Sequence, residues 1–186
     1  MQRTEAARRA EQATQEQLVL AELDDLPADA PLERWLPFTR VAGMPAVTAR
    51  AEAAIHARPD LMQELAAALR SADYRTRTLA LGFVHDDLIP PLPDGLIAPV
   101  REALTATAAF MRAQVEAHFD LRADEFYPAC LLAVDLPDRF PGHAADFAGP
   151  IREMRAVFDG LPPATAPMGR QELDDWLHSH APDRPR

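Results

Sequence analysis

Residues 60–84 read DLMQELAAALRSADYRTRTLALGFV, and this stretch decides the fold class. Leu61, Leu65 and Leu69 stand one helical turn apart, so they form a single apolar stripe. Apart from Met62, the remaining positions up to Arg70 are polar or small, as expected of a helix that covers a core with one face. The spacing therefore predicts a half-buried helix that ends at Arg70.

A second helix is predicted directly after this one, from about Arg75 to Asp87. Asp73 lies in the turn before it and is a favoured N-cap residue. The helix is apolar on nearly every side over residues 79–84, which indicates burial. A half-covered helix followed by a buried one is typical of stacked helical folds, whose exposed faces serve as binding surfaces.

The rest of the chain reads as further helices separated by proline-rich breaks. The sequence has 18 Pro but only 7 Gly, a ratio that suits helix starts and inter-helix breaks better than β-hairpins. No segment reads convincingly as a strand, although residues 126–134 form an apolar run too short for its periodicity to decide. We expect an all-α fold of about eight helices, listed by residue range: 4–26, 32–39, 45–58, 61–70, 75–87, 98–119, 126–134, 145–158 and 169–179, of which 126–134 is the ambiguous one.

Length and composition favour one domain over residues 1–186. A chain of 186 residues can bury a sizeable core without disulfides or metals. Residues 1–17 are almost wholly polar, which predicts a solvated helix or arm, and we expect residues 182–186 to be a frayed tail. The N-terminus lacks the apolar segment of a signal peptide, and no apolar run approaches the length of a membrane span. We expect a cytoplasmic protein.

Charge limits the class of partner. The formal net charge is −10, and all 19 basic residues are Arg, since the chain has no Lys. Nucleic-acid binding requires clustered cations, so this balance argues against it. The absence of both Lys and Asn, whose codons are A-rich, indicates a GC-rich and bacterial genome. An acidic surface suits either a basic partner protein or simple solubility.

Residues 60–88 also resemble a HEAT repeat. The HEAT pattern places Asp at the inter-helix turn, then Val-Arg, then Ala. Asp73, Arg77 and Ala80 fall in that register, and only Thr76, which stands at the Val position, departs from it. The resemblance implies stacked antiparallel helix pairs, with an irregular helical bundle as the alternative. It also implies a scaffold or adaptor, without a cofactor, that holds a partner protein on one face. We expect Asp73 to cap its helix, Arg77 to pair with an acid of a neighbouring helix, and Ala80 to permit close helix packing.

An enzymatic alternative rests on the adjacent residues His85 and Asp86. Preceded by an apolar helix, and with His56 about 30 residues upstream, they resemble the pattern of HD phosphohydrolases. That resemblance implies a divalent metal held by His56, His85, Asp86 and a later acid, Asp124 or Asp135, which activates water against a phosphoester. The simpler interpretation is that His85 and Asp86 are the polar end of a buried helix, with no metal site and no catalytic residues.

The remaining candidates favour structural roles. Cys130 lies in an apolar run and is expected to be a buried, inert thiol. Trp35 and Trp176 are expected to be core anchors and would be interface candidates only if exposed. Acidic residues cluster at predicted helix ends and could neutralise a basic partner if they converge in space: Asp24-Asp25, Asp86-Asp87, Asp120/Asp124/Glu125, Asp135/Asp138 and Asp174-Asp175.

Overall fold

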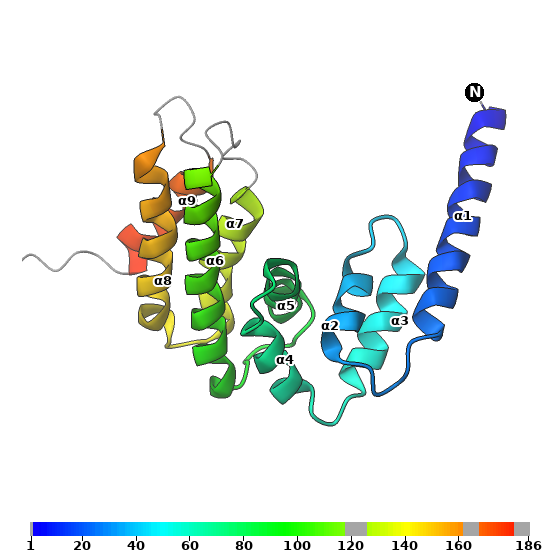
Figure 1. The fold of residues 1–186 in the computed structure, drawn as a ribbon, viewed down its shortest axis with the longest axis horizontal. Coiled ribbons are helices and arrows are strands. Elements are labelled where there is room, and N and C mark those ends of the chain that lie inside the picture. Colours follow the sequence, from blue (N-terminus) through cyan, green and yellow to red (C-terminus); the bar gives the residue numbers. More distant parts are fainter. Residues whose placement is uncertain (1, 118–125, 162–167, 181–186) are drawn as a thin grey trace, which may run out of the picture. The chain divides into compact units, whose positions relative to one another are not determined.

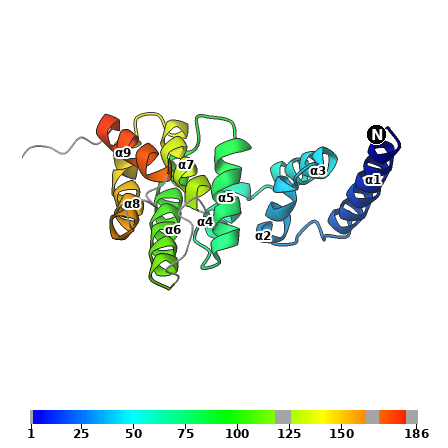
Figure 2. The same cartoon turned by 90° about the horizontal axis from the view of Figure 1, so that it is seen from above.

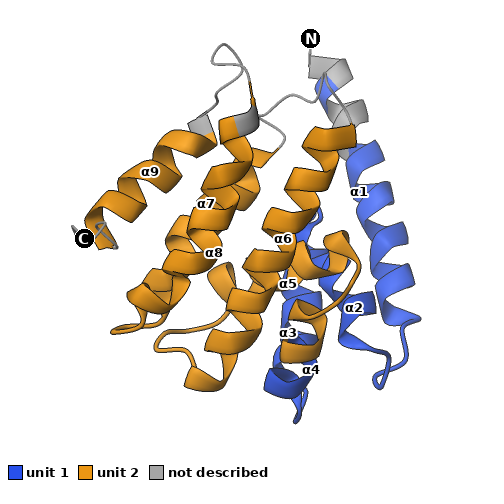
Figure 3. Ribbon diagram, turned by 60° about the vertical axis from the view of Figure 1, so that its left-hand side comes forward, with its two compact units in different colours: residues 1–65 blue, residues 66–186 orange. Residues whose placement is uncertain are grey.

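The computed structural model of the chain confirms the all-α fold class. It describes residues 2–117, 126–161 and 168–180, and every regular element in these ranges is a helix (Figure 1). None of the helices within them is long and apolar enough to cross a membrane. The chain divides into two compact units, residues 1–65 and 66–186, a division that the sequence did not indicate (Figure 3).

Unit 1 is built from helices that enclose a small aliphatic core. Trp35, Leu36 and Ile55 are among its buried residues. The 3₁₀ helix η1 begins where Pro37 would interrupt α-helical hydrogen bonding, so the single helix predicted over residues 32–39 is two short elements. In chain order the elements are α1 (Gln2–Asp24), α2 (Leu32–Trp35), η1 (Leu36–Arg40) and α3 (Pro45–His56). The division between the units falls inside α4 (Leu61–Leu69).

Unit 2 contains the longer helices and an aromatic core. Phe83, Phe140, Phe147 and Phe158 are all essentially inaccessible to solvent. The run over residues 126–134 is helical, which settles the ambiguity between helix and strand. The elements are α5 (Tyr74–Asp86), η2 (Asp94–Leu96), α6 (Ile97–Ala117), α7 (Tyr127–Asp135), η4 (Leu136–Arg139), α8 (Ala144–Val157), η5 (Phe158–Gly160) and α9 (Met168–His180).

The helices of unit 2 pack as a bundle. Helix α6 packs mainly on α8, and α9 packs on both α7 and α8, while α5 contacts α6 and α7 (Figure 2). The α7–α9 contact is close because Gly169 faces Cys130. A Cβ atom added at Gly169 would lie only 2.8 Å from the Cys130 Sγ atom. Three helix ends meet at one end of the bundle, since α6 and α8 begin where α7 ends (Figure 1).

Candidate functional site

Asp73 caps helix α5, as the sequence predicts. Its Oδ2 atom accepts a hydrogen bond from the backbone N–H of Thr76 at 2.7 Å. This hydrogen bond stabilises the charged carboxylate and lowers the pKa of Asp73 below its ordinary value. The residue therefore has a complete structural role at the start of the helix.

Arg77 is buried, but its hydrogen bonds go to neutral oxygen atoms and not to the acid that the sequence predicts. Its Nη1 atom donates to the Ser71 carbonyl at 2.8 Å, and its side chain also donates to the Ala106 carbonyl and the Thr107 hydroxyl on α6. Burial lowers the pKa of the guanidinium. Arg77 thus ties the turn before α5 to α6. Ala80, one turn further along α5, is fully buried.

Among the described residues, those that the resemblance to HD phosphohydrolases singles out do not form a metal site. His56 belongs to unit 1, whereas His85 and Asp86 belong to unit 2. Of the two candidate later acids, Asp135 lies beside His85, and Asp124 lies outside the described residues. Within the described ranges, no three His, Cys, Asp or Glu side chains are arranged to hold a metal ion.

His85 nevertheless gathers two carboxylates at the end of α5. Its Nδ1 atom lies 2.5 Å from Asp86 Oδ1, and its Nε2 atom lies 3.9 Å from Asp135 Oδ2 at the end of α7. Both carboxylates stay about half exposed. The His85 imidazole therefore lies between carboxylates at the ends of α5 and α7.

His143 makes the same kind of arrangement at the start of α8. Its Nδ1 atom lies 2.9 Å from Asp146 Oδ2, and its Nε2 atom lies 3.9 Å from Asp94 Oδ1 in η2. The Asp94 side chain is 85% exposed. Each of these contacts is an ion pair only when the imidazole is protonated.

Arg139 connects the loop that follows α5 to η4. Its Nη2 atom donates to the Leu88 carbonyl, and its backbone carbonyl accepts from the Leu92 N–H. The loop after α5 and the segment between α7 and α8 therefore lie side by side. We call the carboxylates that these two histidines contact the acidic end of unit 2, and define it as Asp86, Asp94, Asp135 and Asp146.

A second group of acids, between α8 and α9, is compensated by arginine. Arg155 donates from Nε to Asp174 Oδ1 at 2.7 Å and also pairs with Asp159. Arg170 lies within 4 Å of the same two aspartates. The carboxylates hold the pKa of the Arg155 guanidinium above its ordinary value. This cluster is an internal ion-pair network.

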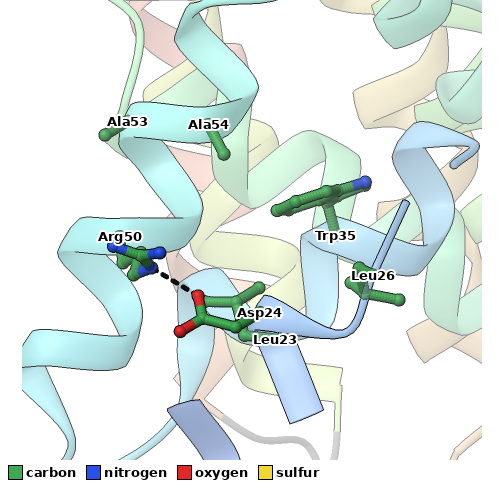
Figure 4. Close-up of a pocket in the computed structure, with 7 residues that line it drawn as sticks. All are labelled: Leu23, Asp24, Leu26, Trp35, Arg50, Ala53 and Ala54. Atoms are coloured by element: carbon green, nitrogen blue, oxygen red, sulfur yellow. Dashed lines mark hydrogen bonds and ion pairs between the residues drawn. The ribbon is translucent and has the colours of Figure 1, made fainter. Parts of the chain in front are cut away.

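Unit 1 has a pocket of about 380 Å³ between α1, α2 and α3 (Figure 4). Its rim carries the exposed ion pair of Arg50 Nε and Asp24 Oδ1 at 2.6 Å. Trp35 contributes part of the wall and is only 7% exposed, and Figure 4 shows its ring nitrogen turned away from that ion pair. Trp35 and Trp176 are both buried, which confirms them as core residues. The carboxylate that lines this pocket, that of Asp24, is paired with Arg50.

The chain matches no protein-family model, no curated protein and no solved structure. Sequence reasoning noted Asp86, Asp87, Asp135 and Asp138 as separate clusters and missed Asp94 and Asp146. The sequence did contain a signal for this surface, because each of these acids lies at a helix end and the ends of neighbouring antiparallel helices meet.

Proposed function

We propose that the chain is a non-enzymatic interaction module that binds a basic partner protein through the acidic end of unit 2. The observation that carries the proposal is that two histidines each hold a pair of aspartates at helix ends, Asp86 with Asp135 at the ends of α5 and α7, and Asp94 with Asp146 in η2 and at the start of α8. These carboxylates are contacted by histidine, whereas the acids between α8 and α9 are contacted by arginine.

Gathering like charges in one place raises the free energy of the folded chain. A basic partner would remove that repulsion and would be steered toward the surface by its potential. The exposed side chain of Asp94 would contact such a partner without any movement of the helices. The net charge of −10 favours a basic protein and disfavours nucleic acid as the ligand.

The test is affinity capture from a lysate of the source organism at low and at moderate salt, read by mass spectrometry. A variant carrying Asp94→Asn and Asp135→Asn removes two charges from the acidic end and preserves side-chain shape. A control carrying Glu11→Gln and Glu22→Gln removes two charges from exposed positions on α1. Circular dichroism would verify that both variants fold.

We expect a stoichiometric basic protein that the wild type and the α1 control retain at low salt. Moderate salt and the Asp94→Asn, Asp135→Asn variant should each weaken its binding at least tenfold, or about 1.4 kcal/mol. A partner that binds the aspartate variant as tightly as the wild type would contradict the assignment of this surface. A partner with an acidic surface would contradict the proposed chemistry.

A further inference from the structure

The loop after α5, which connects Asp86 to Asp94 of the acidic end, exposes one large apolar side chain. Ile89 is 88% exposed, whereas Leu88 and Leu92 on either side of it are buried. Arg139 holds the loop at both places, through the Leu88 carbonyl and the Leu92 N–H. The isoleucine is therefore presented to solvent from a loop that is anchored at both ends.

This exposure is distinctive within the described part of the chain. The other large hydrophobic residues exposed there are Leu18 and Met62, and both belong to unit 1. Leaving an isoleucine in water forfeits the free energy that its burial would provide. Fully buried apolar anchors surrounded by polar residues are the usual energetic centres of protein interfaces.

We propose that Ile89 is the anchor of the acidic end and inserts into an apolar pocket, rimmed by arginine or lysine, on a folded partner protein. This inference rests on the proposed function and adds the shape and chemistry of the partner. A side chain that is 88% exposed cannot lie in a groove of its own chain, so the partner supplies the concave surface. The aspartates around the loop require the rim of that surface to be basic.

The prolines of the loop support a docking role. Pro90 and Pro91 directly follow Ile89, are exposed, and have fixed backbone φ angles. A loop that is stiff before binding loses less conformational entropy when it docks. A linear basic peptide or a polyamine has no preformed pocket for the isoleucine, and a folded domain has one.

The test uses two phage-displayed libraries as probes, each selected against the whole chain. One displays a small three-helix domain randomised over one face, and the other displays linear 12-residue peptides. Affinities of the selected clones are measured for the wild type, Ile89→Ala, Leu18→Ala, and the variant carrying Asp94→Asn and Asp135→Asn. Leu18→Ala is the matched control, because it also truncates an exposed aliphatic residue.

We expect the domain library to yield arginine- or lysine-rich clones that lose at least tenfold in affinity with Ile89→Ala and are unchanged with Leu18→Ala. Clones that weaken only with the aspartate variant would overturn the anchor and leave the proposed function standing. Clones insensitive to both changes would overturn both proposals. Linear peptides that bind through Ile89 as tightly as the domains would overturn the requirement for a folded, concave partner.

Discussion

The two units of the chain differ in the cores that hold their helices. The core of unit 2 is aromatic, with Phe147 and three other buried phenylalanines. Unit 1 has a smaller aliphatic core around Trp35 and relies on Arg58, which donates to the Ala28 and Ala30 carbonyls and pairs with Glu64. Arg77 and Arg139 hold connecting segments of unit 2 in the same way, so the two units differ in the size and chemistry of their cores and not in their use of arginine.

The smaller core of unit 1 follows from the smaller number of residues in that unit. A unit of 65 residues buries about 60% of the surface that its unfolded chain exposes, and a unit of 121 residues buries closer to two thirds. The smaller unit therefore has less hydrophobic free energy to oppose the loss of chain entropy. We expect unit 1 to be the less stable of the two.

The largest expected effect comes from Phe147→Ala. Truncating this fully buried residue should lower the stability of unit 2 by about 3–5 kcal/mol and leave the unfolding of unit 1 unchanged. Each unit contains one of the chain's 2 tryptophans. Urea unfolding followed by fluorescence in the Trp35→Phe background reports unit 2, and in the Trp176→Phe background reports unit 1. If both signals shift together, the units unfold as one cooperative body and the comparison fails.

A smaller effect is expected from Arg77→Met. The substitution leaves the Ser71 and Ala106 carbonyls without their donor and should destabilise unit 2 by about 2 kcal/mol. Arg75→Met, at an exposed position on the same helix, is the control and should cost less than about 0.5 kcal/mol. Since the hydrogen-bond acceptors are neutral, most of the cost of Arg77→Met should persist at high salt, which screens only the interaction of the guanidinium with the Asp73 charge. A cost that disappears at high salt would instead indicate the acid partner expected of a HEAT repeat.

A further effect concerns Cys130 and shows only in alkali. Burial, together with the nearby charge of Glu172, raises the pKa of its thiol from 9.0 to about 12. The folded state favours the neutral thiol, so its contribution to stability is complete below pH 9 and is lost as the pH rises through 12. Relative to Cys130→Ala, the wild type should lose at most about 1.4 kcal/mol per pH unit in this window.

Alkylation by iodoacetamide provides the second measurement for Cys130. At pH 8 the folded chain should react far more slowly than the chain in urea, because the thiolate is the reactive form and is disfavoured in the fold. A thiol that reacts equally fast in both states would show that α7 and α9 separate readily. That result would make unit 2 the less stable unit and reverse the expected order of stability.

Local features of the fold were predictable from the sequence because they depend on neighbouring residues. The stripe of Leu61, Leu65 and Leu69 predicted α4, and the helix expected over residues 145–158 is α8. The cap at Asp73 follows from the chemistry of one side chain and its own helix. These features depend on the spacing of residues along the chain, which can be read directly from the sequence.

Features that depend on distant residues were not predictable. The partners of Arg77 are carbonyl and hydroxyl groups on α6, about 30 positions away, and any residue type supplies a carbonyl. The acidic end required knowing that the ends of α5 and α7 lie together, which helix packing decides. The division into two units also has no composition change to mark it, since it falls inside the continuous helix α4.

The contact between Gly169 and Cys130 has a consequence for how the sequence can diverge. With the Cys130 Sγ atom 2.8 Å from where a Cβ would stand, an alanine at 169 is tolerated only with a smaller residue at 130. The two positions, 39 residues apart, should therefore covary in homologues: glycine at 169 with cysteine at 130, and alanine at 169 with glycine or alanine at 130. Covariation of this pair would indicate that homologues keep the close approach of α7 and α9.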